Sequence, residues 1–403
     1  MAITIKPEAR KAISLGSLCA VSYLAVYIAR NILSAVSPQM VEQDIFTNEE
    51  FGAFSSLFFI TYAIGQLING LVGDKIKSKH MISFGLLLSG ITGLLFSVVT
   101  DHLMLSYITY AVMGFFLSMI YAPMTKVVSE NTTLIYAERC SLGYTFSALL
   151  GSPFAGLLAL FLPWKGGLLF SGALLAVLGL ICMVAFRAFE HKGYIKYHQY
   201  DCSLGEGSSY WVLFKHQIVR FTVVSFITGI IRTAVVFWFP IYLAQYLGYS
   251  ASTASLIFTV ATLAISASSF LAVLLHTLLK RNLILTEFIG FTGSSFCFFL
   301  LLCVHIPLLN VLLLSLAILF SNISAAAMWS IYCPSLRETG VVSGATGFLD
   351  FVSYMAAALA TSIFPHAVDA IGWGGVILVW FSLVAIGALV TLPIKKRKEQ
   401  VTC

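Results

Sequence analysis

The feature that most constrains the fold is a series of twelve long apolar segments. They cover residues 13–38, 50–73, 81–100, 103–128, 140–162, 166–188, 217–247, 252–279, 283–303, 306–332, 339–366 and 371–394. Each is close to or above the roughly 20 residues that a helix needs to cross a bilayer core. The segments do not alternate in polarity, as barrel strands do. With 59% hydrophobic and 10% charged residues, the composition indicates an all-α membrane protein with 12 transmembrane helices.

The first segment follows Lys6, Arg10 and Lys11, as the apolar core of a signal peptide does. It is longer than such a core, and no small-residue cleavage site follows it, so we interpret it as a retained first helix. The eight cysteines are scattered and form no CxxC or Cys/His cluster. We therefore expect no disulfide framework, no metal and no cofactor.

Lysine and arginine indicate the orientation of the chain. With the N-terminus inside, 19 of the 23 basic residues lie in or beside the inner segments. The outer loop 39–49 has three acids and no basic residue. We predict a multi-pass protein of the plasma (inner) membrane with both termini cytoplasmic. The net charge of +6 then reflects topology in the lipid bilayer, and no basic patch suggests nucleic acid.

The longest polar segment divides the chain into two sets of six spans. It is rich in Gly and Ser and mixed in charge, as a linker is. We predict an N-terminal six-helix half at 1–189, a cytoplasmic linker at 190–216 and a C-terminal six-helix half at 217–403. The first span of each half has an arginine followed by a proline eight residues later, in "RNILSAVSP" and "RTAVVFWFP". This match supports two pseudo-symmetric halves.

Those two arginines, Arg30 and Arg232, are the main candidates for a binding site. A charge at mid-bilayer costs at least about 2.5–3.5 kcal/mol and persists where it faces a cavity and meets an anion. Two planar guanidinium groups would match a phosphate or carboxylate dianion. The alternative is a structural ion pair for each arginine. Asp350 is the only acid deep in a span, and Glu287 lies near the start of another.

Several blocks resemble the organophosphate:phosphate antiporters of the major facilitator superfamily, the glycerol-3-phosphate and hexose-phosphate transporters. They are "YIARNILSAVSPQMVEQ", "FFITYAIGQLINGLVGDK", "IIRTAVVFWFPIYL" and "SGATGFLDFVSYMAAALA" with "VDAIGWGG". The resemblance extends from end to end but is thin between the blocks. The resemblance implies the major facilitator superfamily fold, with a substrate site near the membrane midplane between the two halves.

The resemblance also implies roles for particular residues. The family's phosphate-binding arginines fall on Arg30 and Arg232, and its cavity tyrosines on Tyr23, Tyr27 and Tyr62. From the sequence itself, Tyr23, Tyr27 and Arg30 share one helix face. For each tyrosine alone, packing or anchoring at the membrane interface is about as good an interpretation as ligand contact.

The chain departs from the glycerol-3-phosphate members at two positions. Gln66, a further candidate for the substrate site, stands where they have a lysine in the second span, and the fifth span, 140–162, has no histidine. Lys126 in the fourth span is a candidate replacement cation. Asp350 is a further candidate at the site, as a proton carrier or as a partner of an arginine. The organic part of the substrate therefore cannot be carried over from the family.

The stretch "GLVGDKIKSKH" matches the superfamily's cytoplasmic loop between the second and third spans. We expect Gly70 to allow a close approach of helices, and Asp74 to cap a neighbouring helix or pair with a base, with Lys75 beside it. This would latch one state of a transporter. The alternative is an ordinary charged loop. "GSPFAG" in the fifth span, Gly151 to Gly156, indicates packing rather than binding.

The sequence as a whole predicts a secondary transporter and not an enzyme, because it contains no nucleophile–base set. It would exchange a phosphorylated organic anion, of the sugar phosphate or glycerol phosphate type, for inorganic phosphate by alternating access, as a monomer. Two alternatives stay open: a proton-coupled organic-anion symporter using Asp350, and a transporter-like membrane sensor of a phosphorylated sugar.

Overall fold

The computed structural model describes residues 7–197, 211–249, 251–304 and 306–393, and these are helical with short connections. The first seven helices are α1 (Pro7–Glu42), α2 (Asn48–Lys75), α3 (Ser78–Val98), α4 (Leu103–Leu117), α5 (Tyr121–Asn131), α6 (Leu134–Phe161) and α7 (Trp164–His191). The next are α8 (Val212–Lys215), α9 (Ile218–Gly229), the π-helix η1 (Ile230–Val235), α10 (Val236–Gln245), α11 (Ala251–Ser266) and α12 (Ser268–Leu278). The last are α13 (Leu283–Cys303), α14 (Pro307–Ala327), the π-helix η2 (Met328–Tyr332), α15 (Cys333–Ser335), the 3₁₀ helix η3 (Leu336–Thr339) and α16 (Val342–Val390).

Local sequence explains where several helices begin. At the start of α2, the Thr47 hydroxyl accepts from the Glu50 N–H at 3.2 Å, and the Glu50 carboxylate accepts from the Thr47 N–H at 2.7 Å. This capping box satisfies two N–H groups that a helix start leaves unpaired. The Asn282 side chain caps α13 by accepting from the Leu285 N–H, and Pro307 opens α14, where its missing N–H costs nothing.

The described residues contain 11 helices that are long and apolar enough to cross a membrane. The predicted span 283–303 coincides with α13. The predicted span 217–247 is present as α9, η1 and α10 in succession, which divides it into pieces shorter than a full crossing. The last two predicted spans form α16, which changes direction at Gly372, where φ is +67° and an L side chain would be strained.

The chain forms two compact units. The first contains residues 1–226 and 329–359, and the second contains 227–328 and 360–403. The first unit thus includes α1–α8 and most of α9, together with η2 from Trp329 onward, α15, η3 and the start of α16. These units do not follow the predicted halves 1–189 and 217–403, and the two sequential halves stay a prediction. Part of the predicted linker, 198–210, lies outside the described residues.

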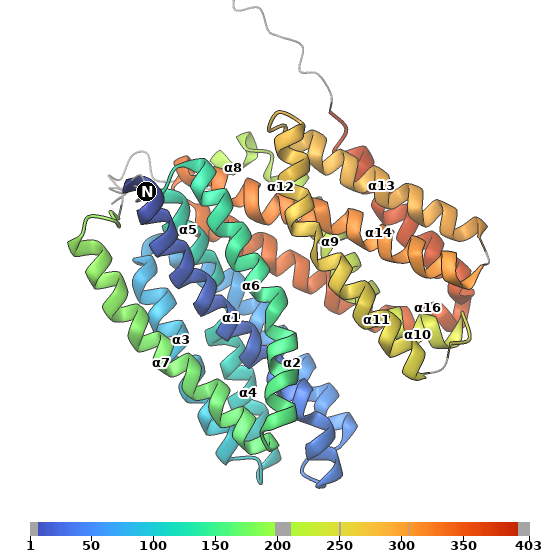
Figure 1. Ribbon diagram of the computed structural model, residues 1–403, viewed down its shortest axis with the longest axis horizontal. Coiled ribbons are helices and arrows are strands. Elements are labelled where there is room, and N and C mark those ends of the chain that lie inside the picture. The colour runs from blue at the N-terminus through green and yellow to red at the C-terminus, as the bar shows by residue number, and fades with distance from the viewer. Residues whose placement is uncertain (1–6, 198–210, 250, 305, 394–403) are drawn as a thin grey trace, which may run out of the picture. The chain divides into compact units, whose positions relative to one another are not determined.

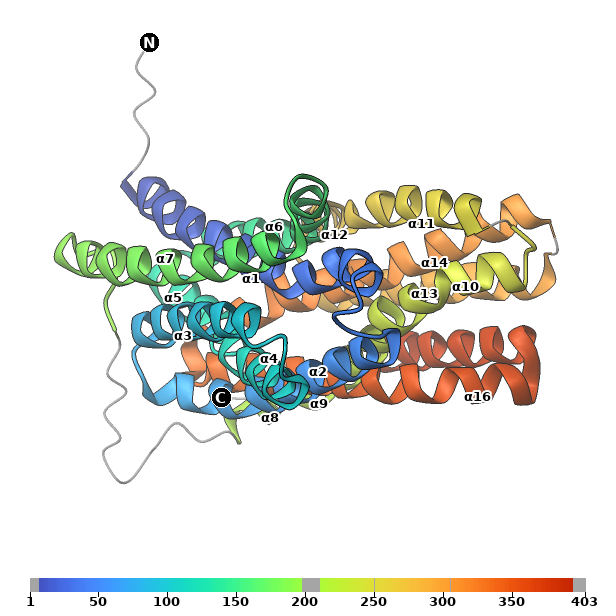
Figure 2. The ribbon, with the colours of Figure 1, turned by 90° about the horizontal axis from the view of Figure 1, so that it is seen from below.

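In the first unit, small residues bring helices into close contact. Helices α1 and α6 lie side by side, as do α3 and α7 (Figures 1 and 2). A Cβ placed on Gly90 of α3 would lie 2.8 Å from the Ala176 Cα of α7, so only glycine allows this approach. A Cβ on Gly151 of α6 would lie 2.8 Å from the Tyr27 backbone carbon of α1. Gly151 of the "GSPFAG" motif therefore packs, as predicted.

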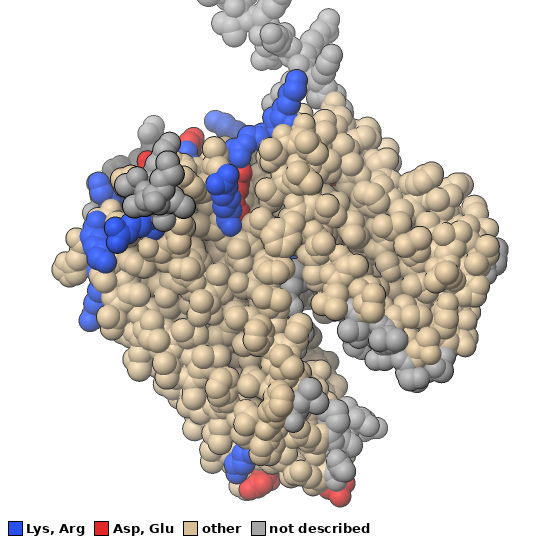
Figure 3. Space-filling view, in the orientation of Figure 1, with Lys and Arg blue, Asp and Glu red and all other residues tan. Residues whose placement is uncertain are grey.

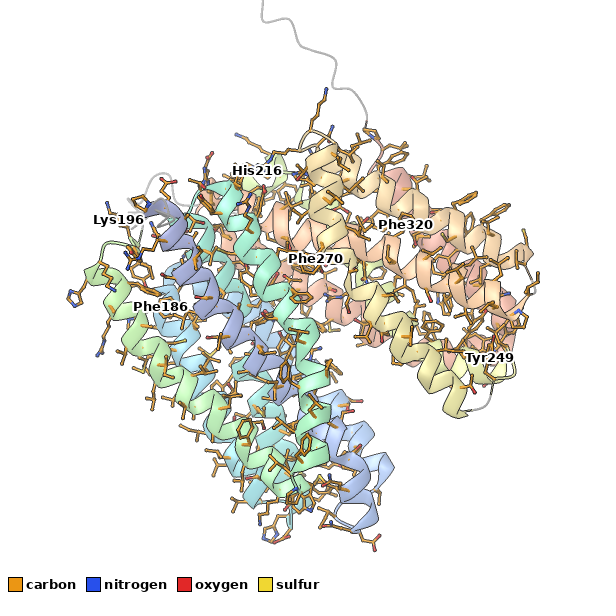
Figure 4. All side chains as sticks on the ribbon, viewed as in Figure 1. Phe186, Lys196, His216, Tyr249, Phe270 and Phe320 are labelled. Atoms are coloured by element: carbon orange, nitrogen blue, oxygen red, sulfur yellow. The ribbon has the colours of Figure 1, made fainter. Side chains whose placement is uncertain are left out.

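The second unit is built around α12, α13 and α14. Figures 1 and 2 show α13 and α14 side by side, and Figure 4 labels Phe320 on α14. A Cβ on Gly290 of α13 would lie 3.0 Å from the Phe320 carbonyl oxygen, so these two helices also meet at a glycine. Ala272, Ile323 and Ala326 form a buried apolar cluster between α12 and α14.

Charge is distributed unevenly over the first unit. Figure 3 shows most of the visible lysine and arginine at the end that carries the start of α1, and acidic side chains with one small basic patch at the opposite end. Lys75, Lys77 and Lys192 are exposed. In Figure 4, Lys196 and His216 are labelled near the basic end. Lys79 of α3 forms a salt bridge of 2.7 Å with Glu190 of α7 there. This separation agrees with the bias that predicts the cytoplasmic side.

Candidate functional site

Arg30 lies inside α1 and is surrounded by aromatic rings. The centroids of Tyr27, Phe59, Tyr62 and Tyr354 lie 5.2, 5.0, 5.1 and 5.0 Å from its guanidinium carbon. We call these four residues the aromatic cage. Ring faces attract a cation by about 0.5–2 kcal/mol each, most strongly where water is excluded. The cage therefore accounts for a guanidinium within an apolar helix.

One hydrogen bond fixes the guanidinium. Its Nη1 donates to the Tyr354 hydroxyl at 2.6 Å. Within the described part of the chain, no carboxylate forms an ion pair with Arg30, so its charge is balanced by rings and by a neutral hydroxyl. A guanidinium has five N–H donors in a planar fork, and Tyr354 takes one of them. The arrangement is that of a cation able to receive an anion.

Helix geometry brings the cage together. Tyr27 precedes Arg30 by three residues on α1, and Phe59 precedes Tyr62 by three residues on α2, so each pair shares a helix face. Tyr354 comes from α16, and its ring meets the Tyr62 ring edge-on at 5.1 Å. Three helices of the first unit thus converge on Arg30.

Tyr23 lies one turn before Tyr27 and is buried beside the cage. Its ring is 5.1 Å from the Tyr27 ring and is stacked on the Tyr121 ring at 5.2 Å. Asp350 lies one turn before Tyr354 on α16, is 5% exposed, and is an electrostatic neighbour of Tyr62 and Tyr121. Of the predicted site residues, Tyr23, Tyr27 and Tyr62 therefore gather around Arg30, and Asp350 lies near Tyr62.

Lys126 is the residue that the structure places elsewhere. Its ammonium donates to the backbone oxygens of Gly73 at 3.0 Å and Asp74 at 2.9 Å, at the C-terminal end of α2. Gly73 is eleven residues beyond Tyr62, about 16 Å along the helix axis. The prediction of Lys126 as a replacement cation beside Arg30 is corrected: in this structure it stabilises the end of α2, where carbonyl groups attract a positive charge.

The predicted gating motif does connect two helices. The Asp74 carboxylate accepts from the backbone N–H groups of Ser343 at 2.9 Å and Gly344 at 2.8 Å, at the start of α16. Gly70 packs on the same helix, because a Cβ there would lie 2.9 Å from the Gly347 Cα. The expected cap of a neighbouring helix by Asp74 is confirmed. Lys75 is exposed beside it.

Arg232 belongs to the second unit and lies in η1, a stretch of π-helix. A π-turn inside an α-helix is often found at a functional position, because it shifts side chains relative to the regular helix. That Arg30 and Arg232 share one cavity stays a prediction.

Sequence reasoning missed Tyr354 and Phe59. Tyr354 follows Asp350 by four residues and Phe59 precedes Tyr62 by three, so helical spacing from a predicted site residue was the signal that could have found them. Neither type of residue is distinctive in a chain with 17 tyrosines and 32 phenylalanines.

The sequence profile of the Major Facilitator Superfamily matches residues 19–358. The chain belongs to this superfamily. Solved structures agree on the fold. A Major Facilitator Superfamily transporter, FucP, in its outward conformation superposes with a TM-score of 0.74 at 15% identity, covering 95% of this chain and 99% of that one. A bacterial homologue of the iron transporter ferroportin, in an outward-facing state, gives 0.77 at 11% identity, covering 94% and 98%.

Three characterised or named proteins are similar to this chain in sequence, at low identity. The membrane sensor protein UhpC of Salmonella typhimurium is 28% identical over 79 residues, which is 20% of this chain and only 18% of the sensor. The glycerol-3-phosphate transporter of Bacillus subtilis is 21% identical over 94% of this chain and 92% of that protein. A probable hexose phosphate transport protein of Chlamydia trachomatis is 18% identical over 41% of this chain and 37% of its own length.

Proposed function

We propose that this superfamily member is a secondary transporter that exchanges a phosphorylated organic anion for inorganic phosphate. The observation that carries the proposal is Arg30: a guanidinium inside a membrane-spanning helix, held by four aromatic rings and one hydroxyl, without an acidic partner among the described residues. Such a group is suited to a phosphate, which can accept two parallel hydrogen bonds from one arginine.

The similar proteins support the chemical class of the substrate. A glycerol-3-phosphate transporter and a probable hexose phosphate transport protein are among them, and both names state a phosphorylated substrate. In the proposal, Arg30 and Arg232 bind the phosphate, and Tyr23, Tyr27 and Tyr62 line the site with Asp350. The Asp74 contact with α16 stabilises one state of the alternating cycle.

The decisive experiment is uptake of labelled inorganic phosphate into proteoliposomes that contain the purified protein. Parallel batches are loaded with glycerol-3-phosphate, with a hexose phosphate, with unlabelled phosphate or with no anion. The exchange proposal expects rapid uptake only with a phosphate-bearing anion inside. Uptake that is independent of the internal anion contradicts exchange.

A sensor of a phosphorylated sugar is the second candidate function, because the match to the sensor UhpC has the higher identity over its 79 residues. A sensor binds its ligand without moving it at a useful rate. Binding of a hexose phosphate to the purified protein, together with no uptake into proteoliposomes, would favour this candidate over the transporter.

A further inference from the structure

Glu287 is a buried acidic residue of the second unit. It lies on the second turn of α13 and is 1% exposed, and neither of its carboxylate oxygens finds a hydrogen-bond partner among the described residues. A buried carboxylate is costly unless it is paired, and an ionisable side chain inside a membrane-spanning helix is functional by default. Glu287 therefore calls for a partner that the surrounding helices do not supply.

Within the described part of the chain, the elements beside α13 leave this carboxylate without a positive partner. Helix α14 contains no ionisable residue, and neither do the last two turns of α16, which pack on α13. On α12, the His276 Nδ1 lies 3.4 Å from the Thr286 hydroxyl. Arg281, in the turn before α13, is an electrostatic neighbour of His276. The polar side chain beside the Glu287 carboxylate is that of Ser324.

Two serine hydroxyls of α14 lie along the contact with α13. The Ser324 hydroxyl donates to the Glu287 carbonyl oxygen at 3.1 Å, and the Ser294 hydroxyl of α13 donates to the Ala317 carbonyl oxygen at 2.8 Å. Ala317, Ser321 and Ser324 share one helix face, so Ser321 lies between two positions that contact α13. Ser321 is 1% exposed, and its hydroxyl also has no partner among the described residues.

A metal cation satisfies this group better than a proton does. A proton on one carboxylate oxygen creates an O–H donor, which then needs an acceptor of its own. A hard cation engages both carboxylate oxygens and takes further oxygen ligands. The Ser324 hydroxyl keeps its lone pairs for such a cation, because its proton is donated to the Glu287 carbonyl oxygen. One carboxylate carries one negative charge, so a monovalent cation leaves the site neutral, whereas a divalent cation would leave a buried positive charge.

We propose that Glu287, with the hydroxyls of Ser321 and Ser324, binds a monovalent metal cation, sodium or potassium, between α13 and α14. The site belongs to the second unit and does not depend on the proposed exchange of phosphate-bearing anions. The bound cation neutralises the carboxylate and joins the two helices. It therefore stabilises the second unit, as any ligand does that binds only the folded protein.

The test combines binding of labelled sodium to the purified full-length protein with thermal unfolding in sodium, potassium or choline chloride at equal ionic strength. Glu287→Gln removes the charge and keeps the shape of the side chain. Glu338→Gln is its matched control, because the Glu338 side chain is 83% exposed. Ser321→Ala removes one hydroxyl ligand. Its control is Ser315→Ala on the same helix, where the hydroxyl is already engaged with the Val311 oxygen at 2.7 Å.

We expect sodium or potassium to raise the unfolding temperature of the wild type by at least about 2 °C relative to choline. Glu287→Gln should abolish sodium binding and this shift. In choline it should unfold no earlier than the wild type, because it buries no unpaired charge. Ser321→Ala should weaken sodium binding by about tenfold, and it decides the question if Glu287→Gln does not fold. Both controls should behave like the wild type.

Three results overturn the site. The first is an equal unfolding temperature of the wild type in all three salts, and the second is sodium binding that persists in Glu287→Gln. The third is a stability that falls with rising pH in the wild type but not in Glu287→Gln, without an effect of sodium or potassium. That result would identify a proton on Glu287 in place of the metal cation.

Discussion

At the scale of the residue, the proposed binding of an anion depends on how Arg30 is stabilised while no anion is bound. Four ring faces and the Tyr354 hydroxyl surround the guanidinium without neutralising it. A carboxylate in their place would form a strong pair and would compete with a phosphate for the same fork. Aromatic stabilisation therefore keeps the charge within the helix while leaving most of its donors for a ligand.

The guanidinium shape matters as much as its charge. We expect Arg30→Lys and Arg232→Lys each to weaken phosphate binding by about tenfold to a hundredfold, because lysine keeps the charge but loses the planar fork. Binding of labelled phosphate to the purified protein measures this. Arg10→Lys is the matched control, since Arg10 is exposed on the same helix as Arg30. Wild-type affinity in both site variants would falsify the bidentate site.

Lys126 shows what a sequence does not reveal at this scale. Its position within an apolar span predicted a charge facing the cavity. A lysine side chain is long and flexible, however, and can carry its ammonium away from the level of its backbone to a more polar place. Here that place is the end of α2, where Gly73 and Asp74 present carbonyl oxygens. Tyr23 and Tyr27 have stiffer side chains, and helical spacing was enough to group them with Arg30 on α1, whereas Tyr62, on α2, was grouped with them by the family resemblance.

At the scale of the element, the length of an apolar segment predicts well that a helix forms there. It predicts poorly where that helix is interrupted. The span 283–303 coincides with α13 because Asn282 caps its start. The span 103–128 instead contains a break between α4 and α5, and 217–247 contains η1. These local changes depend on packing against other helices, which the order of apolar residues does not encode. Gly70 and Asp74 predicted that the end of α2 contacts another helix. They did not predict that this helix is α16.

The glycine contact between α2 and α16 leads to a prediction for Gly347→Ala. A Cβ there would lie 2.7 Å from the Gly70 Cα and would also press on the Gln66 oxygen, both backbone atoms that cannot simply rotate away. We expect a destabilisation of about 1–3 kcal/mol, as for other overpacked sites. Thermal unfolding in detergent measures it. Gly52→Ala, on α2 with no neighbour within 4 Å, should not destabilise the protein.

The polar half of the same contact is the Asp74 cap. Asp74→Asn removes the charge that faces two N–H groups at the start of α16, and can leave only one oxygen as acceptor. Loss of such a cap costs about 0.5–2 kcal/mol. We expect the contact to open more often, so that Ser343→Cys, placed in the Asp74→Asn background, reacts faster with a thiol reagent. An unchanged reaction rate, relative to Ser343→Cys alone, would show that the cap does not hold the two helices together.

At the scale of the whole molecule, the distribution of charge predicts the orientation in the membrane. We expect the end with Lys77 and Lys192 to be cytoplasmic and the connection after α3 to be outside. In a background with the native cysteines replaced by serine, His102→Cys should react with an impermeant thiol reagent added to intact cells. Lys192→Cys should react only after permeabilisation. The reverse pattern contradicts the assignment. Both positions are exposed, which makes them comparable.

The mode of coupling is also a property of the whole molecule. If Arg30 and Arg232 face one cavity, they repel each other when it holds no anion, and a bound dianion draws them together. Reorientation should then be faster in the loaded carrier, because the ligand interacts differently with the two states. Proton-driven net uptake is the alternative to exchange, and it would depend on Asp350. If it pairs with an arginine in the empty state, it lowers the repulsion and permits net uptake driven by protons.

Efflux separates these two possibilities. We expect phosphate to leave preloaded proteoliposomes slowly in anion-free buffer and at least about tenfold faster when an organophosphate is added outside. Exchange requires this dependence, because only a loaded carrier crosses readily in either direction. A pH gradient should have little effect on the exchange rate, and Asp350→Asn should not abolish it. Rapid efflux into anion-free buffer that a pH gradient stimulates, and that Asp350→Asn abolishes, would instead identify a proton-coupled symporter, with Asp350 carrying the proton.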